Sequence, residues 1–288
     1  MPIVTLIAQA GRLSATQVDA LRERWRGTEL RWLSDSEAAE FAVSTADDQW
    51  DVWQDLQGAG IDMVVQPEVG RRKTMLLADM DSTMIGQECI DELADEAGVG
   101  EHVKGITARA MNGELDFDAA LIERVALLKG LDAGIIQRVF EERITFTPGG
   151  KTLIATMKAH GGYAALVSGG FTSFTSRVAE ALGFDEHHAN TLLEEDGHLS
   201  GEVGLPILGR QAKVEALHRI TTAQGLTADD VIAVGDGAND LGMLGLAGSG
   251  VALHAKPVVA AECDLRINHG DLTALLYLQG YSRDQFAK

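Results

Sequence analysis

Short, continuous apolar runs alternate with helical patterns along the chain from about residue 74 onwards. The runs lie at residues 75–78, 163–167, 231–234 and 250–253. Apolar runs without polar alternation are typical of parallel strands that are buried on both faces. Helical patterns separate them, at residues 151–159, 173–182 and 211–222. The alternation predicts an α/β fold in which helices cover both faces of a parallel sheet.

The long segment between the first two predicted strands, about residues 86–146, is almost wholly helical in pattern. Its apolar positions fit several short helices, at residues 90–97, 103–111, 118–128 and 133–142. Open α/β sheets bind ligands beyond the carboxyl ends of their strands. We therefore expect this segment to be a helical insertion that caps the mouth of the sheet.

The first 70 residues follow a different pattern. They predict strand, helix, strand, strand, helix and strand, at residues 4–8, 15–26, 30–33, 41–44, 48–56 and 61–65. Ser14 is a suitable N-cap for the first helix. The order βαββαβ is that of a ferredoxin-like split unit. It also resembles, in pattern only, the small amino-acid-binding regulatory domains called ACT domains.

The role of this N-terminal region stays open between two interpretations. We favour a small accessory or dimerisation domain, which predicts a homodimer formed through this region, over a site for an amino-acid effector. All four tryptophans of the chain lie in it, at positions 25, 32, 50 and 53. A change in tryptophan fluorescence on adding serine would therefore favour the effector interpretation.

The chain is strongly acidic, with 24 Lys and Arg, 43 Asp and Glu, and a net charge of -19. Such a surface repels phosphate backbones, so we expect no nucleic-acid partner. The sequence has no apolar run long enough to span a bilayer and no signal-peptide pattern at its start, so we also expect no membrane partner. Cys89 and Cys263 have no metal-binding spacing, which predicts free thiols and a cytoplasmic protein.

Acidic residues follow the first predicted strand, in the segment Asp79-Met80-Asp81-Ser82-Thr83. Residues two apart in an extended chain face the same side, so Asp79 and Asp81 can point into one cavity. One carboxylate can then attack phosphorus, and the other can act as general acid and base. The alternative is a loop or helix cap, because Asp, Ser and Thr all favour such places.

A second acidic segment, Gly235-Asp236-Gly237-Ala238-Asn239-Asp240, follows the strand predicted at 231–234. Its glycines permit a close approach of the backbone. Asp236 and Asp240 would add two carboxylates to the first pair, and four acids at one sheet edge repel one another unless a cation lies among them. Oxygen ligands and phosphate chemistry indicate Mg²⁺. An Asx-turn before a helix explains this segment equally well when it is taken alone.

Two further features fit a phosphoryl site. The strand predicted at 163–167 ends in Ser168-Gly169-Gly170, whose hydroxyl and backbone N–H groups can hold a phosphate oxygen. Lys213 can supply the fixed positive charge that a phosphoryl transition state needs, although a single lysine is more often a solvated surface charge.

These four segments, in this order, resemble the haloacid dehalogenase superfamily of phosphohydrolases over about residues 74–270. The resemblance implies a Rossmann-like parallel sheet with a helical cap, and it divides the chain into an accessory domain (1–70) and a phosphatase domain (71–288). It implies that Asp79 is the nucleophile and Asp81 the general acid and base. Asp79, Asp236 and the Asp81 carbonyl would bind Mg²⁺, and Asp240 would support its water shell. The phosphoryl oxygens would be held by Ser168, Gly169 and Lys213, with Asn239 close by.

Within that superfamily the chain looks most like the phosphoserine phosphatases, which serve serine biosynthesis. In these enzymes a glutamate soon after the nucleophile binds the serine ammonium, and an arginine of the cap binds the substrate carboxylate. Glu88 and Arg124 stand at the matching positions of this sequence. Met111 and Phe117 match apolar positions that shield the pocket. A zwitterion needs one anion and one cation, and arginine offers a bidentate fork to a carboxylate. Taken singly, Glu88 and Arg124 would more often be solvated helix charges.

The resemblance leaves one alternative with the same chemistry. The phosphoryl group could pass to another alcohol, as in a phosphotransferase, or the substrate could be another small phosphomonoester. Product analysis with candidate acceptors would separate these possibilities from hydrolysis of phosphoserine.

Overall fold

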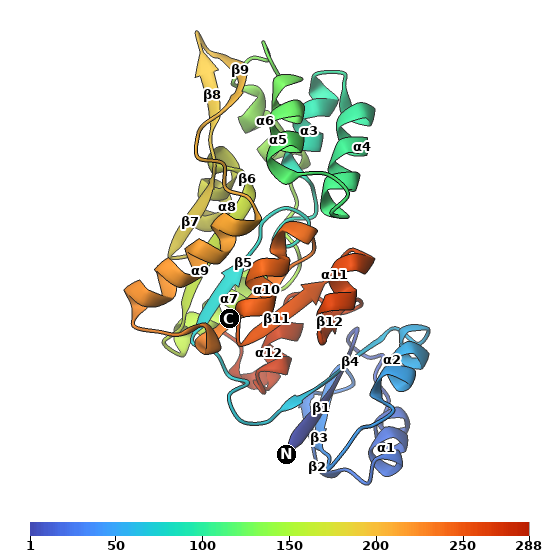
Figure 1. The fold of residues 1–288 in the computed structure, drawn as a ribbon. Coiled ribbons are helices and arrows are strands. Elements are labelled where there is room, and N and C mark those ends of the chain that lie inside the picture. The colour runs from blue at the N-terminus through green and yellow to red at the C-terminus, as the bar shows by residue number, and fades with distance from the viewer. Residues whose placement is uncertain (288) are drawn as a thin grey trace.

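A computed structural model of the chain describes residues 1–287 and shows a small N-terminal sheet unit beside a larger α/β unit (Figure 1). The N-terminal unit has the predicted order βαββαβ. Its elements are β1 (Pro2–Ala8), α1 (Ala15–Arg24), β2 (Thr28–Ser34), β3 (Ala38–Ala42), α2 (Gln49–Gln57) and β4 (Ile61–Pro67). The strands pair antiparallel in the order β2-β3-β1-β4. Ser14 forms the predicted cap of α1, within a capping box that includes Gln17.

The larger unit is built on a six-stranded sheet of order β12-β11-β10-β5-β6-β7, in which every pairing is parallel. Its strands are β5 (Met75–Ala78), β6 (Tyr163–Phe171), β7 (Glu186–Asn190), β10 (Val231–Gly235), β11 (Ser249–Leu253) and β12 (Leu265–Ile267). The predicted α/β class is therefore confirmed. Strands β6 and β7 lie on one side of β5, whereas the later strands β10, β11 and β12 lie on the other side. Open α/β sheets form their binding crevice at such a change in the direction of strand order.

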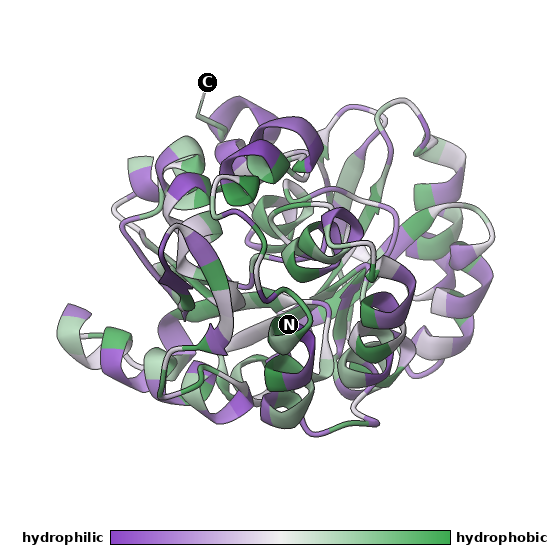
Figure 2. Cartoon of the chain, turned by 90° about the horizontal axis from the view of Figure 1, so that it is seen from above, coloured by the Kyte–Doolittle hydropathy of each residue, from purple (hydrophilic) through white to green (hydrophobic). Residues whose placement is uncertain are grey.

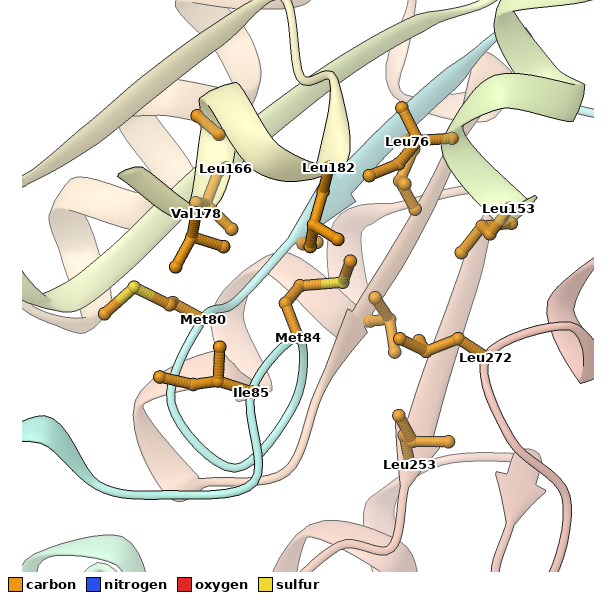
Figure 3. Close-up of a cluster of buried hydrophobic side chains, with 14 of the residues drawn as sticks. Leu76, Met80, Met84, Ile85, Leu153, Leu166, Val178, Leu182, Leu253 and Leu272 are labelled. Carbon is orange, nitrogen blue, oxygen red and sulfur yellow. The ribbon is translucent and has the colours of Figure 1, made fainter. Parts of the chain in front are cut away.

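Helices cover both faces of this sheet, and alternate residues of β5 show how the two layers form. Leu76 and Ala78 face a core shared with α7 (Gly150–Ala159), α8 (Thr172–Leu182) and α12 (Ala274–Leu278). Figure 3 shows part of this core, with Leu76 near Leu153 and Leu182. Met75 and Leu77 face the opposite core, against α9 (Arg210–Gln224), α10 (Leu241–Leu246) and α11 (Pro257–Glu262). Because alternate side chains of this wholly apolar strand enter opposite cores, β5 is packed on both faces of the sheet.

The predicted helical insertion is present as α3 (Cys89–Glu96), α4 (Gly100–Met111), α5 (Phe117–Ala126) and α6 (Ile135–Arg143). It lies beyond the carboxyl ends of the strands, at the top of Figure 1. A hairpin that the sequence did not predict, β8 (Leu192–Glu195) and β9 (His198–Val203), packs beside it. Hydrogen bonds tie Leu199 of β9 to Gly130 and Leu131 of the insertion. Short 3₁₀ turns complete the fold, at Ala228–Asp230, Ala238–Asp240 and Arg283–Gln285.

The N-terminal unit is joined to the α/β unit by buried polar contacts. The fully buried Asp62 of β4 accepts hydrogen bonds from the backbone N–H groups of Asn268, His269 and Gly270, at 2.7–3.3 Å. Gln66 of the same strand donates to the Leu278 carbonyl at 2.7 Å. Such buried carboxylate contacts hold the two units in one arrangement.

The distribution of hydropathy follows these layers. In Figure 2 the central strands are largely hydrophobic, and hydrophilic positions are frequent on the outer helices. Within residues 1–287, no helix combines the length and the apolar character that crossing a membrane requires.

Candidate active site

The carboxyl end of β5 places two buried acids at the mouth of the sheet. Asp79 follows the strand directly, and its N–H donates to the Val234 carbonyl of β10 at 3.0 Å. Asp81 lies in a tight turn in which the Met80 carbonyl accepts the N–H groups of residues 83–85. Its Oδ1 accepts the Cys89 N–H at 3.1 Å. Asp79 and Asp81 are only 3% and 7% exposed, so neither is an ordinary solvated loop residue.

Lys213 of α9 connects the two acidic segments. Its Nζ lies 2.6 Å from Asp79 Oδ1 and 2.6 Å from Asp240 Oδ1, and the side chain is fully buried. Burial disfavours the ammonium, but the charges of Asp240 and Asp79 outweigh this effect and raise the pKa of Lys213. Lys213 is therefore a fixed cation of the site and not the surface charge that a single lysine usually is.

The turn after β10 brings Asp236 and Asp240 beside the first pair. Asp240 Oδ2 accepts the N–H groups of Asp236 and Gly237 at 3.2 and 3.0 Å, which folds the turn back on itself. Carboxylate oxygens of Asp79, Asp236 and Asp240 lie within 4.8 Å of one another. The Asp81 side chain is not part of this group of three.

The acid cluster fits a bound cation. Burial raises the pKa of Asp236 well above its ordinary value, and the charges of Glu88, Asp240 and Asp79 add to the effect. Burial, together with the Asp240 charge, raises the pKa of Asp79 to about 7, although Lys213 opposes the shift. The buried Asp236 Oδ2 has no hydrogen-bond donor among residues 1–287. Buried, mutually repelling carboxylates with a free oxygen are suitable ligands for a hard cation.

A narrow cavity of ≈ 20 Å³ lies between the acids Asp79 and Asp81 and the helical insertion. Seven of the eight predicted substrate-binding residues line it, namely Glu88, Met111, Phe117, Arg124, Ser168, Gly169 and Asn239. The eighth, Lys213, does not line the cavity but contacts Asp79, which does. The structure thus brings together every side chain that the sequence analysis selected.

Three lining residues were missed by the sequence analysis, namely Ile90, Leu121 and Phe171, and Gly170 was named there only as part of the loop after the strand predicted at 163–167. Leu121 precedes Arg124 by three residues on α5, so helical spacing was a signal that it shares the same face. Gly170 allows a close approach, because a Cβ at this position would lie 2.5 Å from Asp81 Oδ2. For Ile90 and Phe171, nothing in the sequence except their apolar character indicates that they line the cavity.

The two charged cap residues share the cavity without pairing. Glu88 Oε1 accepts the Ser82 hydroxyl at 2.6 Å, and burial raises the pKa of Glu88 although that hydrogen bond opposes the shift. Arg124 is 2% exposed and donates to the Ala120 carbonyl and to Thr107 Oγ1, both at 3.0 Å. In the described part of the chain Glu88 and Arg124 form no ion pair with each other. A buried anion and a buried cation left apart in one cavity are arranged for a ligand that carries both charges.

Fold and site together define a hydrolase in which acids from two neighbouring strand ends meet under a helical cap. A model of the haloacid dehalogenase-like hydrolases matches residues 76–245. The chain therefore belongs to the haloacid dehalogenase-like hydrolase family.

Several curated relatives within this family are named phosphoserine phosphatases. The phosphoserine phosphatase of Methanocaldococcus jannaschii is 42% identical over 206 residues, which are 72% of this chain and 97% of the relative. That of Streptomyces coelicolor is 42% identical over 253 residues, which are 86% of this chain. The chain spans only 62% of the length of the Streptomyces relative.

A solved structure matches nearly the whole chain, including the N-terminal unit. This hydrolase of the same family, from Salmonella enterica, is 30% identical, with a TM-score of 0.86. The match covers 96% of this chain and 98% of the Salmonella protein. The similarity of fold therefore extends over both the N-terminal unit and the α/β unit.

Proposed function

We propose that the chain is a phosphoserine phosphatase, which hydrolyses O-phospho-L-serine to serine and phosphate and so completes serine biosynthesis. One observation carries the proposal: the cavity that holds Asp79 and Asp81 also holds the unpaired Glu88 and Arg124. A phosphomonoester of an amino acid needs all four groups. The names of the relatives at 42% identity support the same substrate.

In the first step Asp79 attacks the phosphorus, and the bond from phosphorus to the serine oxygen breaks. Asp81 gives its proton to the leaving oxygen. Burial and the nearby Glu88 charge raise the pKa of Asp81 well above its ordinary value, although the Cys89 N–H opposes the shift. The direction of this shift favours the protonated carboxyl group, which is the form that an acid needs.

In the second step a water attacks the phosphorus of the aspartyl phosphate and gives its proton to Asp81. The bond from phosphorus to the Asp79 oxygen breaks, which releases phosphate and restores both carboxyl groups. Ser168, the Gly169 N–H, Asn239 and Lys213 hold the phosphoryl oxygens through both steps. When bound by Asp79, Asp236 and the Asp81 carbonyl, with Asp240 supporting its waters, Mg²⁺ supplies positive charge that offsets the charge of the phosphoryl group.

The size of the cavity implies a moving cap. A cavity of ≈ 20 Å³ holds about one water, far less than phosphoserine needs. We therefore expect the helical cap to open for substrate and to close again before the reaction, which excludes bulk water.

The test is phosphate release from O-phospho-L-serine with Mg²⁺ and with EDTA, beside sugar phosphates, phosphothreonine and an aryl phosphate. Magnesium-dependent release that is selective for phosphoserine is expected. Asp79→Asn, checked by mass spectrometry for reversion by deamidation, should be inactive. Magnesium-dependent release from the other esters alone would retain the Asp79 chemistry and reject the roles given to Glu88 and Arg124.

We propose further that the enzyme works in the cytoplasm, since its two cysteines are free and buried, as in a reducing compartment. We also propose a homodimer through the N-terminal domain. The edge strand β2 pairs on one side only, with β3, so its other side is available to a second copy. Light scattering of the whole chain should give twice the monomer mass, and a monomer mass would reject the dimer.

A further inference from the structure

Asp236 borders a groove that is distinct from the substrate cavity. Its Oδ1 accepts the Thr83 hydroxyl at 3.3 Å, whereas the buried Oδ2 has no donor within residues 1–287. A groove of ≈ 370 Å³ reaches Asp236 between the turn after β5 and the segment after β11. Ser82, Thr145 and Lys256 are among the residues that line it. The groove therefore reaches Asp236 from a side that the substrate cavity does not share, although the carboxylate itself is almost fully buried.

Lys256 lies where the groove meets Asp236. Its Nζ is 3.6 Å from Asp236 Oδ2, which is a charge contact but longer than a hydrogen bond. Its backbone N–H donates to the Asp236 carbonyl at 3.0 Å, so the base of the side chain is tied to the end of β10. The Lys256 side chain is 37% exposed and that of Asp236 only 2%. The ammonium can thus approach or leave the carboxylate while its backbone stays in place.

We propose that Lys256 is a positioning residue that shares Asp236 with the divalent cation of the site. The ammonium neutralises the carboxylate when no ion is bound, and it yields Oδ2 to an ion that enters through the groove. Because two cations at one oxygen repel each other, Lys256 weakens ion binding while it stabilises the acid cluster. The inference rests on the proposed function insofar as that function assigns Mg²⁺ to Asp236.

The first test is a calorimetric titration of the purified full chain with Mg²⁺. Lys256→Met removes the charge and keeps the length of the side chain, so it should bind Mg²⁺ about threefold to tenfold more tightly. Lys256→Arg, which keeps the charge, should bind as the unchanged protein does. Lys151→Met is the matched control, because Lys151 is exposed on α7, and it should have no effect. Unchanged or weaker binding by Lys256→Met would overturn the inference.

The second test is thermal unfolding in EDTA and in saturating Mg²⁺. A residue that competes with the ion stabilises only the ion-free protein, so Lys256→Met should lower the unfolding temperature in EDTA and not in Mg²⁺. An equal loss in both conditions would mean a merely structural role and would reject the proposal.

Asp236→Asn separates the two hypotheses. If this variant binds Mg²⁺ as the unchanged protein does, the proposed metal site itself is wrong. If it loses binding while Lys256→Met changes nothing, only the role of Lys256 is wrong.

Discussion

Arg124 Nη1 donates to Thr107 Oγ1 at 3.0 Å, and Thr107 in turn donates to Asp91 Oδ1 at 2.6 Å. With the bond from Arg124 Nε to the Ala120 carbonyl, this chain of contacts holds the guanidinium on two sides. Arginine has five N–H donors, so others are left for a ligand in the cavity. The cap therefore presents a buried, oriented cation before any substrate arrives.

Arg124→Lys should impair recognition of the substrate carboxylate. The lysine keeps the charge but loses the planar fork, so KM for phosphoserine should rise about tenfold to a hundredfold. Phosphoethanolamine lacks the carboxylate and should be hydrolysed as before. Steady-state kinetics on both esters measure the difference. Thr107→Val should act in the same direction with a smaller effect, since it removes only the support. An equal loss on both esters would contradict this role.

Asp81→Asn should slow the reaction according to the leaving group. Loss of a general acid costs about 10²–10⁴-fold in rate, and the cost is greatest for a poor leaving group such as the serine alkoxide. An aryl phosphate, whose leaving group needs no proton, should react with Asp79 almost normally and give a burst of phenol. Rapid-mixing measurements detect the burst. If both substrates slow equally and no burst occurs, Asp81 is not the acid.

Much of the molecule was predictable from the sequence because the central strands are wholly apolar. The strand at 75–78 and that at 231–234 are buried on both faces, so hydrophobicity alone locates them, and the acids that follow must meet at one sheet edge. The two edge strands of the six-stranded sheet, β7 and β12, were not predicted. Strand β7 has the sequence Glu-His-His-Ala-Asn, and only its pairing with β6 makes it a strand.

Other features depend on contacts between distant segments, which no local pattern records. The hairpin β8–β9 packs on α5, whose residues lie more than sixty positions earlier in the chain. The double pairing of Lys213 with Asp79 and Asp240 needs α9, β5 and β10 to converge. The sequence indicated that a cation should be present there. It did not indicate that this lysine is fully buried.

The stability of the ion-free protein should depend on pH through Asp79. Its pKa is about 7 in the folded protein against an ordinary value of 3.8, so between these values the folded state binds more protons than the unfolded state. The free energy of unfolding therefore falls as the pH rises from about 4 to about 7, and this contribution is constant outside that window.

Urea unfolding in EDTA, for the unchanged protein and for Asp79→Asn, isolates this effect. The asparagine variant cannot ionise at this position, so its stability relative to the unchanged protein should grow through the same pH window. Saturating Mg²⁺ should remove the dependence, because the ion favours the ionised carboxylate. A constant difference between the two proteins in EDTA would show that Asp79 does not titrate in this range.

Asp62→Ala should loosen the N-terminal domain from the catalytic domain. The fully buried carboxylate accepts three backbone N–H groups of residues 268–270, and its removal leaves those donors without partners. An unsatisfied buried donor costs about 1–3 kcal/mol, and water can reach the half-buried Asn268 and His269 more easily than Gly270. We therefore expect a total loss near the lower end for three donors, about 3–5 kcal/mol of unfolding free energy. Hydrogen exchange should also show faster exchange at Asn268, His269 and Gly270. Asp47→Ala, on the exposed surface of the same domain, is the matched control and should change little. A loss no larger than that of the control would mean that Asp62 does not anchor the domain.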